Sequence, residues 1–445
     1  MDAIRSRNDA IVAIATPPGR GGVGVVRVSG PNLGKFTELL LGRNPLPRRA
    51  TLAFFKDDQG NTIDQGIALY FSGPASYTGE DVLELQGHGG PVLMQMLLNR
   101  CVQLGARLAA PGEFTQRAFL NDKLDLVQAE SVADLIEATT ETAARLAMRS
   151  LRGEFSNIVD ALVQQLVELR VLVEAVMDFP DEDLDGMSQS NSEQRLAEVR
   201  KALKRALEGG RQGSILRSGL QVVLTGRPNV GKSSLLNRLS GENVAIVTPV
   251  PGTTRDALRQ TIQIDGVPLN IIDTAGLRET SDEIESMGIQ RTWEAVSQAD
   301  LLLFVLAANE GLTSEDQNLI DQFPAGLPRL LVYNKMDLSL EIEEATPERV
   351  FVSAKTGAGL PELKRSLLTA AGWRPGEDIV MARHRHLDAL KQADTHLESA
   401  EMVIGRPEFF AEELRLAQQQ LCQITGEFTA DDLLGEIFSR FCIGK

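Results

Sequence analysis

The sequence predicts a multidomain fold in which a doubly wound α/β domain is inserted into a helical bundle domain and preceded by a compact α+β domain. A length of 445 residues suggests about three domains. Residues 217–377 alternate strand-like apolar runs with helical runs, as a doubly wound sheet requires. Residues 121–216 and 378–445 both show helical periodicity, which favours one bundle formed from two segments. Two separate helical domains are the alternative, because sequence alone cannot pair helices.

The amino-terminal region, residues 1–120, has a different texture. It is rich in Gly and Pro and contains short strand-like runs, such as 24–28 and 81–85. Strands of this length between turn residues are typical of a small α+β domain.

The first helical region predicts two helices. Apolar residues recur at three- and four-residue steps from Leu151 to Val176, which indicates a long amphipathic helix that Pro180 would end. A second, charged helix is predicted over about 193–207. The glycine pair 209–210 that follows it is expected to act as its C-cap.

Composition limits the class of protein. The hydrophobic fraction of 43% and the charged fraction of 24% are those of a globular protein, and no apolar run approaches the ~20 residues of a membrane span. Three cysteines cannot form a disulfide framework and the amino-terminus lacks an apolar signal core, so a cytoplasmic protein is expected. A net charge of −16 argues against a generally RNA-binding surface, so any RNA contact would depend on a local basic patch that the sequence does not locate.

The segment 226–233 has the spacing G-x-x-x-x-G-K-S between an apolar run, 220–225, and a helical stretch, 234–239. A strand, a glycine turn and a helix N-terminus together direct backbone N–H groups at phosphate oxygens. Lys232 is expected to reach the β- and γ-phosphates and assist catalysis, and the Ser233 hydroxyl to ligate Mg²⁺. The neighbours expected to contact the nucleotide are Asn229, Val230, Gly231 and Ser234.

Three further motifs follow in order, each after a strand-like run. They are Asp273-Thr274-Ala275-Gly276, Asn334-Lys335-Met336-Asp337 and Ser353-Ala354-Lys355. A carboxylate at Asp337 can accept from the two N–H groups on the Watson–Crick edge of guanine, which adenine lacks, so GTP is expected to be preferred over ATP. Asp273 is expected to hold Mg²⁺ through water, and the segment from Ser353 to close over the base with a backbone N–H. Together these motifs predict a P-loop GTPase.

Other segments resemble one particular family. The segments 16–24, 77–90 and 120–125 and the final Cys442-Ile-Gly-Lys445 are similar to those of the tRNA modification GTPases called MnmE or TrmE. The resemblance implies an amino-terminal domain that binds tetrahydrofolate and forms a homodimer, a discontinuous helical domain and an inserted G domain. It also implies a complex with the flavoprotein MnmG, of heterotetramer type, that forms the 5-(carboxymethyl)aminomethyl group on the wobble uridine of certain tRNAs.

The resemblance also suggests how hydrolysis proceeds. Leu277 stands where Ras-like enzymes place a water-orienting glutamine, so another group must orient the water. Glu285 matches the position with that role in the family, although a solvated acid is the alternative. The family's K⁺ site matches Asn229, Thr248, Val250 and Thr253, and Thr254 would ligate Mg²⁺. Thr248 and Thr254 are also expected to contact GTP as its γ-phosphate orders their loop, and G domains would pair during turnover.

The family's folate site matches Arg27, Glu84, Lys123 and Lys445, with 5-formyl- or 5,10-methylene-tetrahydrofolate as the expected ligand. A carboxylate can accept from pterin N–H groups, and cations can contact carbonyl or carboxylate oxygens. Cys442 is expected to act as a nucleophile, with an inert residue in a docking tail as the alternative. His88 lies between glycines, so a ligand contact or a structural turn would explain it.

A regulatory GTP-binding switch that acts on ribosome assembly is the competing hypothesis. Such a protein would need a basic RNA-binding segment. The flanks of the α/β segment contain no dense run of Lys or Arg, which favours the enzyme.

Overall fold

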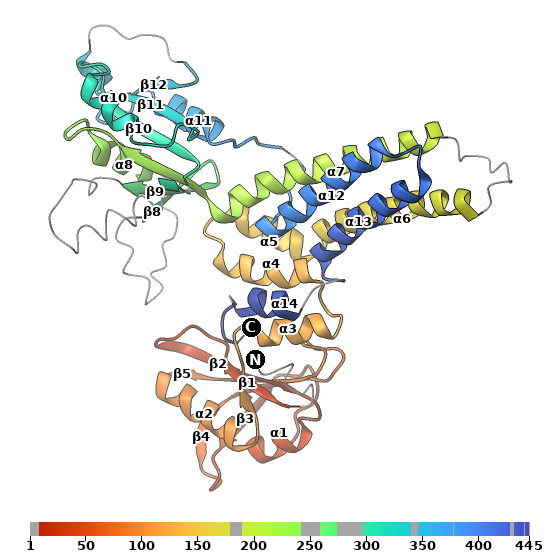
Figure 1. Ribbon diagram of the computed structural model, residues 1–445. Coiled ribbons are helices and arrows are strands. Elements are labelled where there is room, and N and C mark those ends of the chain that lie inside the picture. Colours follow the sequence, from red (N-terminus) through yellow and green to blue (C-terminus); the bar gives the residue numbers. More distant parts are fainter. Residues whose placement is uncertain are drawn as a thin grey trace. The chain divides into compact units, whose positions relative to one another are not determined.

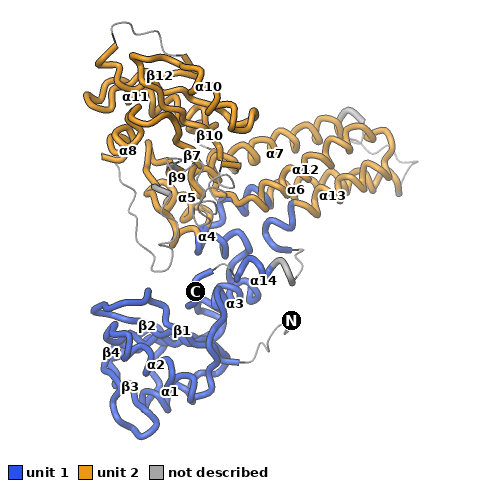
Figure 2. Tube along the Cα trace, turned by 60° about the vertical axis from the view of Figure 1, so that its left-hand side comes forward, with its two compact units in different colours: residues 1–133, 151–159, 421–445 blue, residues 134–150, 160–420 orange. Residues whose placement is uncertain are grey.

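The computed structural model describes residues 9–178, 189–241, 259–273, 296–297, 299–339, 346–376, 378–427, 431–439 and 441–444. The chain divides into two compact units (Figures 1 and 2). The first contains residues 1–133, 151–159 and 421–445, and the second contains residues 134–150 and 160–420.

The first unit contains a six-stranded sheet with strand order β3-β4-β5-β2-β1-β6. Its pairs are antiparallel except β1 with β6. The strands are β1 Ile11–Ile14, β2 Gly21–Gly30, β3 Thr51–Lys56, β4 Thr62–Phe71, β5 Asp81–Gly89 and β6 Arg107–Leu108. The helices α1 Gly34–Leu41 and α2 Pro91–Gln103 pack on one face of this sheet, where Val12, Val26, Leu83 and Leu97 form the core.

The opposite face of the sheet carries a smaller cluster. Ile11 and Ala13, which alternate with the core residues of β1, pack against Phe114 in α3 Glu113–Leu120. The helices α4 Leu126–Glu137 and α14 Asp431–Ser439 form a further cluster around Leu126 and Phe438. Carboxy-terminal residues therefore pack with the amino-terminal sheet in one unit.

The second unit contains the predicted doubly wound sheet, with strand order β12-β11-β10-β7-β9-β8. The strands are β7 Leu220–Thr225, β8 Arg259–Ile264, β9 Val267–Asp273, β10 Leu301–Ala307, β11 Arg329–Asn334 and β12 Arg349–Phe351. All pairs are parallel except β8 with β9. Leu303 of β10 packs on the side of α8 Lys232–Ser240 and α11 Leu360–Ala370, and Phe304 packs on the side of α10 Ser314–Ile320. Helices thus cover both faces, which confirms the predicted fold class.

Helices on either side of this sheet in the sequence pack together. They are α5 Glu141–Leu151, α6 Glu154–Asp178, α7 Gln189–Ser218, α12 His384–Met402 and α13 Pro407–Thr425. Arg200 of α7 donates to Glu398 of α12 at 2.8 Å, and Arg170 of α6 donates to Gln418 of α13 at 2.6 Å. The sheet is therefore inserted between α7 and α12 of one bundle (Figure 1).

The predicted end of the second helix is wrong. Helix α7 continues through the glycine pair to Ser218. A Cβ on Gly209 would lie 2.2 Å from the carbonyl oxygen of Asp378, and one on Gly213 would lie 1.8 Å from that of Val380. These glycines allow a second segment to cross the helix closely, and a C-cap is not their role. The long helix also begins later than predicted, at Glu154, because Leu151 ends α5.

Candidate functional site

The phosphate loop joins the end of β7 to the start of α8. Asn229 and Gly231 have φ angles of 64° and 95°, and a Cβ on Gly231 would lie 2.4 Å from the Nδ2 atom of Asn334. Lys232 Nζ donates to the carbonyl oxygens of Gly226 at 2.6 Å and Arg227 at 3.0 Å, so its ammonium lies over the loop. This tight turn before a helix N-terminus fits a phosphate ligand.

Three further residues predicted to contact the nucleotide lie in this loop or just after it, and they differ in exposure to solvent. Ser233 and Ser234 are exposed in the first turn of α8, and Val230 is buried. The hydroxyl of Ser233 is thus available to a metal ion at the helix N-terminus. In the described part of the chain no group of three or more His, Cys, Asp or Glu side chains could hold a metal ion.

Asn334 links the phosphate loop to the third motif. It ends β11, it is 2% exposed, and its Nδ2 atom donates to the carbonyl oxygen of Val230 at 2.9 Å. Its Oδ1 atom accepts from the backbone N–H of Ala354 at 3.0 Å. One buried amide therefore holds together two loops that are 20 and 104 residues away in the sequence.

Asp337 lies in the 3-10 helix η1 Met336–Leu338, where its Oδ1 atom accepts from the Ser353 hydroxyl at 2.6 Å. Ser353 is fully buried, whereas Asp337 is exposed. The hydrogen bond from Ser353, with a smaller contribution from the charge of Lys355, lowers the pKa of Asp337. The carboxylate thus stays ionised and can accept from two N–H donors of a purine.

Arg227 is a residue of this site that sequence reasoning missed. Its Nε atom donates to Asp316 at 2.9 Å and its Nη2 atom to Glu310 at 2.8 Å. Asp316 is fully buried and closes a capping box with Thr313 at the start of α10. The phosphate loop is thereby anchored to the neighbouring helix. No local pattern announces a pair that is separated by 89 residues.

Of the other residues predicted for this site, some belong to the described part of the chain and some do not. The backbone of Asp273 ends β9, beside Leu224 of β7, and Lys335 has a φ angle of 64° between Asn334 and Asp337. Lys355 is exposed. The remaining predicted residues lie outside the described residues: Thr248, Val250, Thr253, Thr254, Thr274, Ala275, Gly276, Glu285 and Lys445.

A second candidate site lies on the amino-terminal sheet. Arg27 of β2 and Glu84 of β5 are register partners, and their Nη2 and Oε1 atoms lie 2.8 Å apart. The Arg27 guanidinium also donates to the carbonyl oxygen of Gly444 at 3.3 Å and lies 5.7 Å from the ring centroid of Tyr77 and 5.8 Å from that of Phe114. The two side chains keep 19% and 18% exposure, so the pair remains accessible to a ligand.

Two other residues predicted for this region lie in different surroundings. Lys123 is exposed in the turn after α3, where its backbone N–H donates to Ala118 at 2.9 Å. Cys442 is exposed, and its carbonyl oxygen accepts from the Gly112 N–H at 3.3 Å. The structure therefore brings together Arg27, Glu84 and the backbone of the carboxy-terminal segment, and exposes the thiol.

His88 contacts the buried carboxylate of Asp64 through both its ring and its backbone. Its ring Nδ1 atom lies 2.8 Å from Oδ1 of Asp64, and its backbone N–H donates to Oδ2 of Asp64 at 2.8 Å. Burial acts to raise the pKa of Asp64, but the hydrogen bonds from His88 and the backbone lower it overall. The His88 side chain is 71% exposed. These contacts favour the structural explanation of the glycine-flanked histidine.

Comparisons with known proteins identify the family. The model of the GTP-binding protein TrmE N-terminus matches residues 10–123, and that of the MnmE helical domain matches residues 126–442. The tRNA modification GTPase MnmE of Nitrosomonas europaea is 58% identical over 98% of this chain and 99% of its own length. The chain belongs to the MnmE family.

Two further relatives are similar to this chain over nearly its whole length. The tRNA modification GTPase MnmE of Dechloromonas aromatica is 56% identical over 99% of this chain and 100% of its own length. That of Azoarcus sp. is 59% identical over 98% of each chain. Membership of the MnmE family, together with the phosphate loop and the Asn334–Asp337 geometry, makes this chain a GTP hydrolase. Among the helices that the structure describes, none combines the length and apolarity that a bilayer crossing requires.

Proposed function

We propose that the protein couples GTP hydrolysis to modification of the wobble uridine, position 34, of certain tRNAs in the cytoplasm. Its full-length relatives, which are named tRNA modification GTPase MnmE, support this function. The observation that carries the proposal is the guanine-recognition geometry, in which Ser353 holds an ionised Asp337 beside Asn334.

GTP would be held at its phosphates by the loop that ends in Lys232, with Mg²⁺ ligated by Ser233 and Thr254. Asn229, Thr248, Val250 and Thr253 would hold K⁺, which supplies positive charge where other GTPases use an arginine. Glu285 would orient the attacking water through hydrogen bonds. G domains of a homodimer would pair during turnover.

K⁺ should accelerate GTP hydrolysis more than Na⁺ at equal ionic strength, because only an ion of matching size replaces the missing arginine charge. Steady-state phosphate release measures the two rates. The variant Asn229→Ala is the control, and its rates should no longer differ between the salts. Equal rates in K⁺ and Na⁺ for the unmodified protein would remove the cation from the mechanism.

The amino-terminal unit would bind 5-formyl- or 5,10-methylene-tetrahydrofolate through Glu84, Arg27, Lys123 and Lys445. Glu84 would accept from pterin N–H groups, and the cations would contact the ligand's oxygens. Isothermal titration with a reduced folate tests the site. Arg27→Ala and Glu84→Ala should weaken binding at least about tenfold, and Arg48→Ala, which removes an exposed arginine of the same unit, should not.

In a complex with the flavoprotein MnmG, the one-carbon unit would become the methylene carbon on C5 of uridine, which loses its C5 proton. An amino acid of the composition of glycine would supply the remaining amine and carboxymethyl part of the 5-(carboxymethyl)aminomethyl group. Cys442 would act as a nucleophile during this transfer, since its thiol is exposed and it stands two residues before Gly444, whose carbonyl oxygen accepts from Arg27. Nucleoside analysis of tRNA from cells that lack the gene tests the function. The modified wobble uridine should disappear. Its persistence, accompanied by defective ribosomal subunits, would favour a regulatory switch in ribosome assembly.

A further inference from the structure

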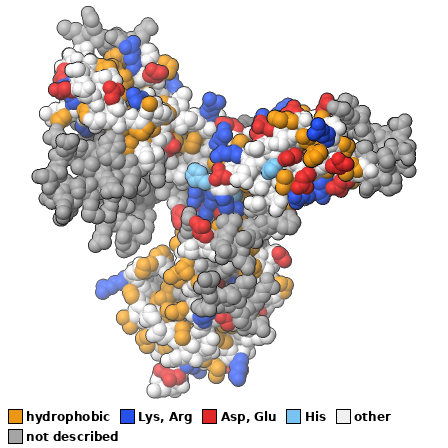
Figure 3. Space-filling model, in the orientation of Figure 1, with side chains coloured by type: hydrophobic (Ala, Val, Ile, Leu, Met, Phe, Trp, Pro, Cys, Tyr) orange, Lys and Arg blue, Asp and Glu red, His pale blue; other side chains and the backbone are white. Residues whose placement is uncertain are grey.

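Helix α7 has the opposite charge to the other long helices of the bundle. It contains seven Lys or Arg residues and three Glu residues. The other long helices, α6, α12 and α13, each contain more Asp and Glu than Lys and Arg, and the whole chain has a net charge of −16. On the face of the bundle seen in Figure 3, cations and carboxylates are interspersed. This is expected where charged side chains of neighbouring helices form ion pairs.

Packing within the unit explains part of this positive charge. Arg200 donates to Glu398 at 2.8 Å, pairs with Glu401 and lies 3.7 Å from Asp394, and its side chain is only 16% exposed. Arg217, at the other end of α7, donates to Asp134 at 2.8 Å. These two arginines hold α7 against its neighbours.

Three other cations of α7 have no such role. Lys201, Lys204 and Arg205 are exposed, and none of the ion pairs found among the described residues includes them. Lys201 precedes Lys204 and Arg205 by three and four residues, spacings at which like charges on adjacent turns of a helix repel each other by a few tenths of a kcal/mol per pair. Folding alone does not account for this arrangement, which an anionic partner would stabilise.

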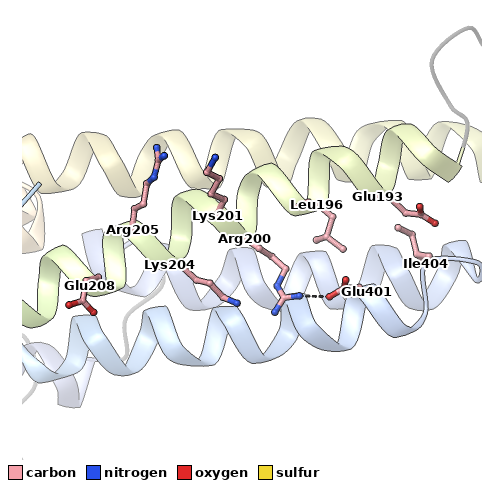
Figure 4. A pocket seen from close by; sticks show the side chains of 10 residues that line it. Glu193, Leu196, Arg200, Lys201, Lys204, Arg205, Glu208, Glu401 and Ile404 are labelled. Atoms are coloured by element: carbon pink, nitrogen blue, oxygen red, sulfur yellow. Dashed lines mark hydrogen bonds and ion pairs between the residues drawn. The ribbon is translucent and has the colours of Figure 1, made fainter.

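The three residues border a hollow of about 780 Å³ that is also lined by Arg200 and by the carboxylates Glu193, Glu208 and Glu401. Leu196 and Ile404 contribute apolar surface to it. Figure 4 shows Lys201 and Arg205 projecting from α7 away from α12, whereas Lys204 projects toward α12. We call Lys201, Lys204 and Arg205 the α7 basic face.

We infer that the α7 basic face binds the phosphate backbone of tRNA; this inference rests on the proposed function. A chain with a net charge of −16 repels RNA except where positive charge is concentrated. The side chains that line the hollow include no aromatic residue on which a base could stack. The interaction would therefore position the tRNA through its phosphates, without reading its sequence.

The test measures the binding of fluorescently labelled tRNA to the full-length protein by anisotropy, over a series of NaCl concentrations. The variant Lys201→Ala/Arg205→Ala should raise Kd at least about tenfold near physiological salt. It should also reduce the slope of log K against log salt by about two, because two phosphates would no longer be neutralised. GTP hydrolysis should remain at the level of the unmodified protein, because neither residue has a described contact with the phosphate loop or with Asn334, Asp337 and Ser353.

The matched control is Lys391→Ala/Arg415→Ala, which removes the same charge from α12 and α13. Both cations are exposed and pair with carboxylates on their own helices, at 3.1 Å and 2.8 Å, so tRNA binding should not change. An unchanged Kd and slope for the α7 variant would overturn the inference. Normal tRNA binding together with failure to bind the flavoprotein would also overturn it, since the face would then serve a protein.

The tRNA-binding experiment can contradict the docking surface without contradicting the proposed function. If the unmodified protein binds tRNA and the deletion strain loses the modified uridine, an unaffected α7 variant contradicts the docking surface alone. If tRNA from the deletion strain keeps its modification, the proposed function is contradicted. If the unmodified protein also shows no salt-dependent tRNA binding, the docking surface is contradicted as well.

Discussion

Asp337 shows how a buried hydroxyl prepares a carboxylate for base recognition. The Ser353 hydroxyl holds one carboxylate oxygen at 2.6 Å, so the side chain has less freedom to lose when a nucleotide binds. Asn334 adds rigidity because it spans Val230 and Ala354. The proposed selectivity for guanine would therefore depend also on residues that need not touch the base themselves.

The variant Asp337→Asn should reverse the preference between GTP and xanthosine triphosphate. Asparagine would present an N–H group to the guanine donors, which leaves polar groups unpaired, whereas xanthine offers a carbonyl there. The preference for GTP should fall on the order of a hundredfold. Turnover with each nucleotide measures this, with Asp321→Asn as an exposed control. Unchanged discrimination would show that Asp337 does not read the base.

Glu113 makes the first unit sensitive to acid. Burial acts to raise its pKa, but hydrogen bonds from Arg107 and the Ala110 N–H and the charge of Arg117 lower it overall. Because its pKa is lower in the folded state than in the unfolded state, its contribution to the free energy of unfolding is complete above about pH 4.5. That contribution is lost as the pH falls through the lowered value. Asp9, whose pKa is also lowered, adds to the same trend.

The variant Glu113→Gln should lower the free energy of unfolding by about 2 kcal/mol at pH 7, and its stability should fall less steeply in acid. Urea titrations at pH 7 and pH 4 measure both effects. Glu141→Gln removes a carboxylate whose side chain is 76% exposed, and should change little. A parallel pH dependence for Glu113→Gln and the unmodified protein would contradict the assignment.

For single residues, the sequence predicted which positions lie together where a motif has a fixed spacing from a strand end, and their roles stay predictions. Lys232, Asn334, Asp337 and Ser353 follow motifs whose distance to a strand end is constant. Arg227 was missed because its partner, Asp316, belongs to a different helix. The family resemblance assigned Arg27 and Glu84 to one expected folate site, but it did not predict their ion pair, since a cation on one strand does not reveal which strand lies beside it.

Among the elements, α7 shows that a pair of glycines after a helical run does not always mark the end of the helix. A Gly-Gly pair after a charged helical run indicates a C-terminus, yet the helix extends to Ser218. The glycines are required by the segment around 378–382, which crosses α7 with its backbone close against the helix. That segment is about 170 residues away in the sequence, so nothing local distinguishes a capping glycine from a packing glycine. The strand runs at 24–28 and 81–85 were recognised because alternation is a local property.

The variant Gly213→Ala should destabilise the second unit. Its Cβ would lie 1.8 Å from the Val380 carbonyl oxygen, so the crossing segment must shift, at a cost of about 1–3 kcal/mol or more. Gly435→Ala in α14 is the matched control. It has no atom within 4 Å of the added Cβ, so higher helix propensity should stabilise it by about 0.5–1 kcal/mol. Thermal unfolding compares the two. Equal stability of Gly213→Ala and the unmodified protein would contradict the close crossing.

In the whole molecule, one carboxylate joins both connections of the inserted α/β sheet. Asp134 Oδ1 accepts from Arg217, near the end of α7, at 2.8 Å and from Arg383, just before α12, at 2.7 Å. Its side chain is 4% exposed. The sequence predicted the insertion from helical periodicity on both sides. It could not predict the residue that ties the two connections, and the boundaries at 120, 216 and 377 stay predictions.

The variant Asp134→Asn should lower the free energy of unfolding by about 3 kcal/mol, because it leaves two partly buried guanidinium groups without their shared anion. Its basal GTP hydrolysis should persist, since none of the described nucleotide residues contacts Asp134. Urea unfolding and phosphate release measure the two properties. Asp388→Asn, whose side chain is 58% exposed, is the control. Unaltered stability would show that the arrangement contributes nothing to holding the insert.

The bond between Arg27 and the Gly444 carbonyl joins positions 417 residues apart. A ribosome that adds roughly 5–20 residues per second needs about 20–80 s to make the intervening chain. The amino-terminal sheet can emerge and fold long before its distant partner exists. Polypeptides interrupted before residue 441 would therefore carry the sheet without the carboxy-terminal partner of Arg27, and the proposed folate site would be incomplete in them.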